Sequence, residues 1–256
     1  MQIFDTHAHL LSREFDADRP QVLREMQEKG VSLVMEACCT EKDIPGILAF
    51  TRENGFAYGA LGLHPEELYH VVPDALEQVE KNLMQPGILA VGEIGLDYHW
   101  ETNPPREMQK QYLDGQLSMA AAYKKPVILH VRDAHGDCMD ILRAHRQGLE
   151  GVMHCFSGSY ETARECLDLG LYIGVGGVLT FKNARKLKEV VQKVPLNRLV
   201  LETDCPYMAP EPLRGTRNYP GNLIYVRAAL AKLLNMEEEA LSRILFENGK
   251  RLFHME

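Results

Sequence analysis

The chain has 256 residues, a length that fits one α/β barrel or two smaller domains. Hydrophobic residues make up 45% of it, enough for a full core, and no window approaches the roughly 18 uninterrupted apolar residues that a transmembrane helix needs. The formal net charge of −8 argues against a protein that coats nucleic acid by broad electrostatics, although it allows a phosphate substrate held at a metal site.

The N-terminus and the cysteines predict a cytoplasmic protein. The first residues lack the basic stretch and long apolar run of a signal peptide. None of the six cysteines forms a C-x-x-C pair, and a chain of this length does not need disulfide bonds to be stable. We therefore expect free thiols in a reducing cytosol. The lack of a long apolar run predicts no membrane association, and we also expect a monomer.

Eight short apolar runs alternate with longer helical patterns along the chain. The runs are almost continuously hydrophobic, as expected for parallel strands that are covered on both faces. The predicted strands cover residues 3–7, 31–37, 58–64, 88–93, 127–131, 151–155, 171–177 and 198–203.

Amphipathic stretches lie between and after these strands. Residues 107–123 place apolar side chains at helical spacing, and residues 160–169 form a helical stretch that is followed by a glycine, a common residue after a helix end. Residues 223–234 and 238–253 predict two more helices. The most basic stretch, 181–193, favours the solvated face of a helix over a patch that tracks a nucleic-acid strand.

Eight strands, each followed by a helix, in roughly 250 residues describe a (β/α)8 TIM barrel, here a single domain over residues 1–256. A doubly wound open sheet is the alternative, and it usually carries a glycine-rich phosphate turn after its first strand. The first strand of this chain ends in His-Ala-His instead, so the barrel is favoured.

Polar side chains with metal-binding chemistry follow six of the predicted strands. The carboxyl ends of the strands of a parallel barrel share one rim, where such enzymes build their active sites. The candidates on this rim are His7, His9, His64, Glu93, His130, Arg132, His154 and Asp204. A lone histidine at a strand end is usually structural, but five histidines and two carboxylates from separate strands indicate a metal site, because such groups are costly in an apolar barrel mouth unless paired or metal-bound.

Four of the histidines and the two carboxylates are too many ligands for one tetrahedral ion with an open position. Two ions roughly 3.5–4 Å apart need a bridging group, and a carboxylate has two oxygens to offer. Our hypothesis takes Glu93 as the bridge. The other ligands would be His7, His9 and Asp204 at one ion and His130 and His154 at the other.

Six ordered motifs contain these residues: D-T-H-A-H-L (5–10), G-L-H-P (62–65), V-G-E-I-G-L-D-Y (91–98), P-V-I-L-H-V-R-D-A (126–134), H-C-F-S-G (154–158) and L-E-T-D-C-P-Y (201–207). Together they resemble the motifs of the TatD family of metal-dependent deoxyribonucleases, a branch of the metal-dependent hydrolase barrels. The resemblance continues through residues 209–220 to the C-terminal helix.

The resemblance implies metal-ligand roles for His7, His9, Glu93, His130, His154 and Asp204, the same six residues. It implies that His64 lines the pocket and that Arg132 lies near the substrate, where a salt bridge with Asp133 or Asp137 is the alternative for this arginine. Many relatives have a histidine before an Arg-Gly pair where this chain has Leu213, and this departure leaves substrate specificity open. We expect the adjacent Arg214 to contact substrate.

The implied activity is a divalent-metal-dependent deoxyribonuclease, expected to be a 3′–5′ exonuclease on single-stranded or damaged DNA ends, in DNA repair or degradation. Two ions, Zn, Mn or Mg, would activate the attacking water. Glu93 and Asp204 are the expected catalytic residues, and Asp204 fits either a general base or a ligand only.

Two other functions use the same rim. A small-molecule hydrolase of amides, lactones or phosphoesters is one, but many such enzymes carry a carbamylated lysine after the fourth strand, where this chain has Glu93 and no neighbouring lysine. A non-catalytic metal-binding protein is the other, and the full ligand set disfavours it.

Several further residues near the strand ends allow two interpretations. Asp97 fits either a carboxylate that orients a ligand histidine or a turn residue. Glu202 is expected to make an internal polar contact one layer below the rim. Tyr98, Trp100 and Tyr207 either stack on a base or pack under a loop.

Overall fold

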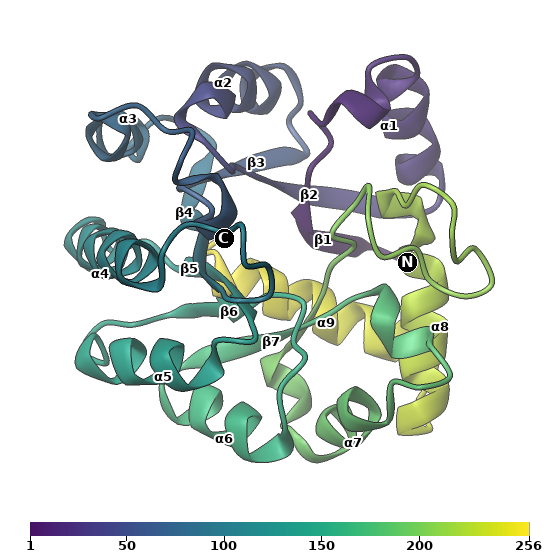
Figure 1. The fold of residues 1–256 in the computed structure, drawn as a ribbon. Coiled ribbons are helices and arrows are strands. Elements are labelled where there is room, and N and C mark those ends of the chain that lie inside the picture. The colour runs from purple at the N-terminus through teal and green to yellow at the C-terminus, as the bar shows by residue number, and fades with distance from the viewer. Residues whose placement is uncertain (256) are drawn as a thin grey trace.

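Eight parallel strands pair in chain order into one sheet that curves into a barrel, with helices around its outer face (Figure 1). The computed structural model describes residues 1–255. The strands are β1 (Ile3–Ala8), β2 (Val31–Ala37), β3 (Ala57–Leu61), β4 (Ile88–Asp97), β5 (Val127–Arg132), β6 (Gly151–Met153), β7 (Leu171–Val175) and β8 (Leu199–Leu201). The predicted single-domain (β/α)8 barrel is confirmed, and of its predicted extent, 1–256, residue 256 lies outside the described residues.

A helix lies in each connection between consecutive strands, and two helices follow β8. The helices are α1 (Arg19–Glu28), α2 (Ile44–Glu53), α3 (Ala75–Asn82), α4 (Arg106–Tyr123), α5 (His135–Ala144), α6 (Tyr160–Asp168), α7 (Arg185–Lys193), α8 (Leu223–Leu234) and α9 (Glu238–Leu252). In the part of the chain that the structure describes, none of them is long and apolar enough to cross a bilayer.

The barrel interior is filled by side chains from every strand. One buried residue of each strand contributes to this inner cluster: Phe4, Met35, Ala60, Ala90, Ile128, Val152, Tyr172 and Val200. Phe246 and Leu252 of α9 join the same cluster, and α9 packs on β1 and β8. Figure 1 shows α9, in yellow, crossing behind the strands. The barrel is therefore closed at its amino-terminal end, and only the opposite end is free for a site.

The seam between β8 and β1 is held by few backbone contacts. Asp204 N donates to His7 O (3.0 Å) and His9 N donates to Cys205 O (2.9 Å). Below them the buried Asp5 carboxylate accepts from the Thr203 N–H (2.9 Å) and hydroxyl. These bonds place the segments that carry the two N-terminal histidines and Asp204 side by side.

Most of the predicted elements lie within a few residues of the observed ones, with two informative differences. The third strand, predicted to reach His64, ends at Leu61, and His64 precedes Pro65 at the start of a 3₁₀ turn. The fourth strand, predicted to end at Glu93, continues to Asp97 because β4 stays paired with β5. Of the basic stretch predicted as a solvated helical face, 181–193, residues 185–193 form α7, whose apolar side is buried, and residues 181–184 precede the helix.

Candidate metal centre

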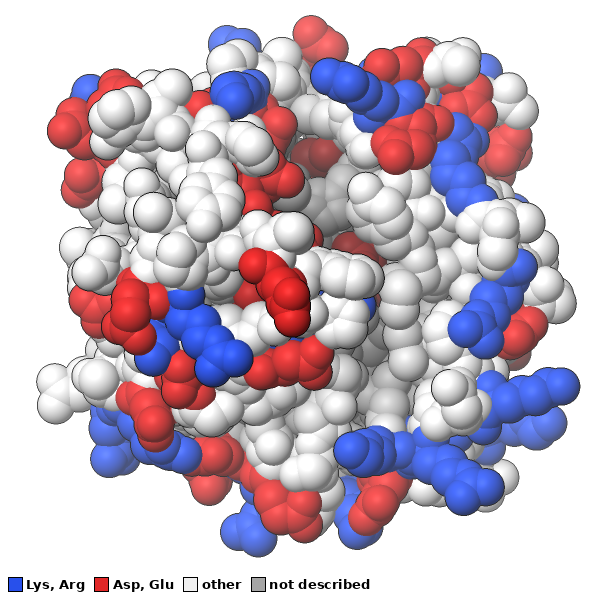
Figure 2. Space-filling model, viewed as in Figure 1, with Lys and Arg blue, Asp and Glu red and all other residues white. Residues whose placement is uncertain are grey.

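Imidazoles and carboxylates converge at the carboxyl end of the barrel, as the strand ends predicted. Figure 2, viewed as in Figure 1 from this end, shows a hollow at the centre with acidic side chains visible inside it. The predicted ligands come from β1, β4 and β5 and from the segments that follow β1, β6 and β8.

Glu93, in the middle of β4, is the centre of the cluster. Its Oε2 lies 3.2 Å from His7 Nε2 and 3.5 Å from His9 Nε2, and these two nitrogens are 3.1 Å apart. Asp204 Oδ1 lies 3.8 Å and 3.7 Å from the same nitrogens. Two atoms that bind one ion through bonds of about 2.1 Å are about 3.0 Å apart at a right angle and up to about 4.2 Å apart on opposite sides of the ion. The spacing and chemistry of this set therefore fit a metal ion.

The other oxygen of Glu93 faces a second group of imidazoles. Its Oε1 lies 3.0 Å from His130 Nδ1, 3.4 Å from His64 Nε2 and 3.5 Å from His154 Nε2. Each oxygen of the carboxylate thus has its own set of nitrogens. His64 was predicted only to line the pocket, but it lies as close to Glu93 as the predicted ligands do. The sequence feature that could have indicated this is the position of His64 in a motif at a strand end.

Two buried carboxylates contact the outer side of the imidazoles. Asp97 Oδ2 lies 2.8 Å from His130 Nε2, and Glu202 Oε1 lies 3.4 Å from His154 Nδ1. A carboxylate hydrogen-bonded to the imidazole, as Asp97 is to His130, fixes the orientation and tautomer of a ligand histidine, whereas Glu202 makes only an ion-pair contact with His154. Asp97 also accepts from a backbone N–H of the following loop, so it serves both predicted roles. Gly174 leaves room for Glu202, since a Cβ there would lie 2.3 Å from Oε2.

The charges of the cluster follow from burial and from the neighbouring groups. Burial alone would raise the pKa of Glu93, but the surrounding imidazoles outweigh it and hold that pKa well below its usual range. Burial lowers the pKa of His7 to about 3. Burial also opposes a charge on His130, but its hydrogen bonds to Asp97 and Glu93 raise that pKa to about 10. Glu93 and His7 thus already have the ionised and neutral forms that ligate metals, whereas His130 must release a proton. Burial is likewise outweighed by neighbouring groups at His9 and His154, whose pKa values are raised, so these imidazoles must also release a proton.

Arg132 extends from the end of β5 to the exposed rim. Its guanidinium lies 5.7 Å from the centroid of the Trp100 ring. The alternative salt bridges with Asp133 or Asp137 are not seen in the described residues, because those carboxylates pair with other side chains. Arg132 therefore keeps its charge available at the mouth of the centre, and its contact with substrate stays a prediction.

The other residues expected to contact substrate lie on the surrounding loops. Arg214 stacks on the Phe181 ring at 4.2 Å, at the surface, and the structure does not bring it into the cluster. Trp100 and Tyr207 are 55% and 57% exposed, which contradicts packing under a loop. Tyr98 is partly buried, and its hydroxyl donates to Asp137 (2.9 Å).

The barrel and this donor set together define a metal-dependent hydrolase. The model of the TatD-related DNase family matches residues 4–254, and the chain belongs to this family, as the motifs predicted. It is 38% identical over 254 residues to the uncharacterized metal-dependent hydrolase YabD of Bacillus subtilis, covering 99% of both chains. It is 33% identical to the 3′-5′ ssDNA/RNA exonuclease TatD of Erwinia billingiae, again covering 99% of both. The crystal structure of YJJV, a TatD homologue from Escherichia coli K12, superposes with a TM-score of 0.95 at 35% identity and covers 99% of this chain and 98% of that one.

Proposed function

We propose that this hydrolase cleaves the phosphodiester bonds of DNA as a divalent-metal-dependent 3′–5′ exonuclease on single-stranded or damaged ends. One observation carries the proposal: the Glu93 carboxylate lies between two sets of imidazoles, an arrangement suited to two ions and hence to phosphoryl chemistry. The name of the Erwinia relative, a 3′-5′ ssDNA/RNA exonuclease, supports the same substrate class and polarity.

The donors lie on both sides of Glu93, which would lie between two ions. His7, His9 and Asp204 would hold one ion; His130 and His154, which both face Glu93 Oε1, would hold the other, with His64 beside His130. Zn, Mn and Mg are the candidate metals. When bound, the ions would lower the pKa of a water molecule and neutralise charge on the substrate phosphate.

Three residues have roles that follow from their positions. The Asp204 side chain is 20% exposed against 4% for Glu93, so Asp204 is the carboxylate that can accept a proton from the attacking water. Glu93 stays ionised between the two sets of ligands. The exposed guanidinium of Arg132 binds the substrate phosphate through charge-assisted hydrogen bonds.

We further propose that the protein is a cytoplasmic monomer that acts in DNA repair or degradation. All six cysteines are free thiols in the described chain, which suits a reducing compartment. Sedimentation analysis of the purified protein tests the monomer.

The test is hydrolysis of a single-stranded oligonucleotide labelled at its 5′ end. The protein is stripped with EDTA and then supplied with Mg, Mn or Zn. The variants Glu93→Ala and Asp204→Ala are assayed in the same way. The control is Glu239→Ala, a change at an exposed site on α9 at the far end of the barrel. We expect metal-dependent loss of single nucleotides from the 3′ end, retained in Glu239→Ala and reduced at least 100-fold in the other two, since each removes a proposed ligand.

Near-normal hydrolysis by either active-site variant, with metal in excess, would contradict the proposed roles. No cleavage with any metal would direct attention to amide, lactone and small phosphoester substrates. Tight binding of metal without turnover of any of these would point to a non-catalytic protein.

A further inference from the structure

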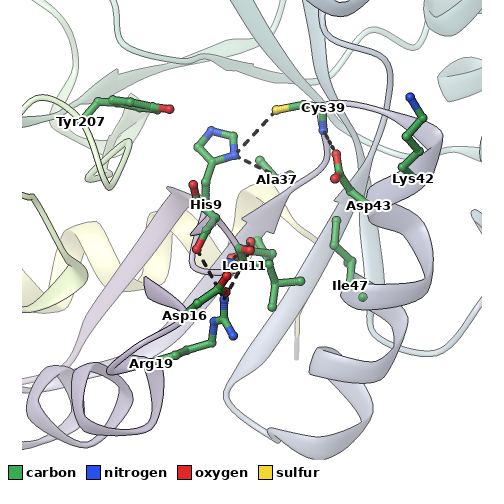
Figure 3. Close-up of a pocket in the computed structure, with 13 residues that line it drawn as sticks. His9, Leu11, Asp16, Arg19, Ala37, Cys39, Lys42, Asp43, Ile47 and Tyr207 are labelled. Atoms are coloured by element: carbon green, nitrogen blue, oxygen red, sulfur yellow. Dashed lines mark hydrogen bonds and ion pairs between the residues drawn. The ribbon is translucent and has the colours of Figure 1, made fainter. Parts of the chain in front are cut away.

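A cavity of about 510 Å³ opens beside the metal centre, between the segment after β1 and the start of α2 (Figure 3). His9 lines this cavity and also belongs to the metal centre. Its Nε2 faces Glu93, while its Nδ1 lies 3.2 Å from the carbonyl oxygen of Ala37 and 3.9 Å from Cys39 Sγ in the cavity wall. The cavity therefore adjoins the metal centre along the His9 ring.

The uncharged part of the lining is aliphatic and aromatic. Leu11 and Ile47 contribute side chains from two different elements, and Gly46 leaves the space between them open. Tyr207 comes from the loop after β8 and lies across His9 from Ile47 and Cys39 (Figure 3). Its ring is 57% exposed, so a stacking face is available to a ligand.

The acidic groups of the lining already have partners. Glu36 accepts from two backbone N–H groups of the segment after β1 (2.8 and 2.9 Å), and Asp43 accepts from two in the segment after β2 (3.0 and 2.8 Å). Asp16 pairs with Arg19. Two cations also line the cavity, and both are bonded within the chain: Arg19 donates to Leu10 O (2.7 Å) and Lys42 donates to His70 O (3.1 Å). The charged groups are therefore already paired, and the space between them suits an uncharged group.

We propose that this cavity binds the nucleoside attached to the phosphate at the metal centre, so that it holds the last nucleotide of a strand; this inference rests on the proposed function. The volume lies in the range typical of small-molecule sites. A base is uncharged and has two apolar faces, which match the aliphatic lining and the Tyr207 ring. A strand that continued through the cavity would bring in a second phosphate, and the two lining cations are already bonded to Asp16, Leu10 O and His70 O, so an end is accepted and an internal segment is not.

Isothermal titration calorimetry on Mn²⁺-loaded protein tests this without requiring turnover. The ligands are inorganic phosphate, deoxyribose 5-phosphate and thymidine 5′-monophosphate. We expect the wild type to bind the nucleotide at least tenfold more tightly than deoxyribose 5-phosphate, from base stacking. An ideal Cβ at Gly46 lies 3.4 Å from Leu11 Cδ1, so Gly46→Leu fills the cavity and reduces this ratio roughly tenfold.

Each cavity variant has a control variant that shows whether weaker nucleotide binding comes from the changed cavity or from a damaged fold. Tyr207→Ala removes an exposed ring and lowers the ratio of the affinity for the nucleotide to the affinity for deoxyribose 5-phosphate. Tyr207→Phe keeps the ring and should keep the wild-type ratio. Glu53→Leu places the same apolar side chain at an exposed position of α2 outside the cavity and keeps the wild-type ratio.

Equal binding of the nucleotide and of deoxyribose 5-phosphate by the wild type would overturn the inference, and so would an unchanged ratio in both Gly46→Leu and Tyr207→Ala. If the nucleotide preference and its loss in the variants are seen but DNA is not cleaved, the nucleoside site stands and the proposed function fails.

Discussion

Asp97 is the residue that fixes how the His130 ring is oriented in the metal centre. Its Oδ2 lies 2.8 Å from His130 Nε2, and its Oδ1 accepts from the His99 N–H. Asp97→Asn keeps the size and one acceptor oxygen but places an amide N–H donor against the imidazole. We expect metal affinity to fall 10- to 100-fold with the fold intact. Competition with a chromophoric chelator measures the affinity, and circular dichroism checks the fold.

The matched control for this change is Asp133→Asn. Asp133 also pairs with a histidine, His99, at 2.7 Å, but it lies outside the cluster and is exposed. Metal affinity like that of the wild type is expected for the control. An equal affinity in Asp97→Asn would show that His130 does not depend on its carboxylate partner.

The sequence predicted which residues of the metal centre lie close together, but not all of the contacts that they make. His7, His9 and Asp204 lie at the ends of strands that the parallel barrel must place at one rim, so their proximity follows from topology. The sequence could not decide between the two predicted roles of Asp97, because the pairing of β4 with β5 extends the strand to this residue and no local pattern shows where pairing stops. The place of His64 beside Glu93 depends on a loop whose path is set by packing.

Among the elements, α4 offers a test of local helix energetics. Gly115 lies inside this 18-residue helix, and a Cβ there would meet only Leu76 Cδ1, at 4.0 Å. Because glycine costs a helix interior conformational entropy, Gly115→Ala is expected to raise the free energy of unfolding by about 0.5–1 kcal/mol. Urea unfolding followed by circular dichroism measures the change, and a decrease would contradict it.

A glycine in β4 is expected to respond in the opposite direction. Gly95 has φ +152°, and a Cβ there would lie 1.8 Å from the carbonyl oxygen of His130, a clash with backbone that cannot move aside cheaply. Gly95→Ala should lower the free energy of unfolding by more than about 2 kcal/mol. The same urea experiment tests it, and stability within error of the wild type would show that β4 and β5 can separate.

The element order of the barrel could be predicted because eight apolar runs and the helices between them leave few topologies. The ends could not. Residues 151–155 read as one apolar run, but β6 ends at Met153. Likewise β8 covers three residues of the predicted 198–203, since beyond Leu201 the chain bonds to β1 mainly through side chains and single backbone contacts.

For the whole molecule, the net charge of −8 limits how the proposed nuclease can bind nucleic acid. The 36 Asp and Glu outnumber the 28 Lys and Arg, so affinity should come from the metal centre and the strand end and not from counterion release along a duplex. We expect weak duplex binding and, for single strands, a plot of log affinity against log salt with a slope shallower than about −3. Fluorescence anisotropy between 50 and 300 mM salt measures both, and duplex binding that stays tight at high salt would contradict the prediction.

Metal removal should lower the stability of the whole barrel, because the proposed ligands lie between residues 7 and 204 and an ion held by them would connect distant strands. Metal at 100 times its Kd stabilises the folded state by about 2.7 kcal/mol, which for a chain of this size corresponds to a Tm increase of about 5–10 °C. Differential scanning calorimetry of protein in EDTA and in excess metal measures the shift. In Glu93→Ala, which removes the group between both ligand sets, the shift should disappear, whereas Glu239→Ala should keep it. Since this change in Tm does not depend on any substrate, an identical Tm with and without EDTA would contradict the metal centre itself and not only the nuclease activity.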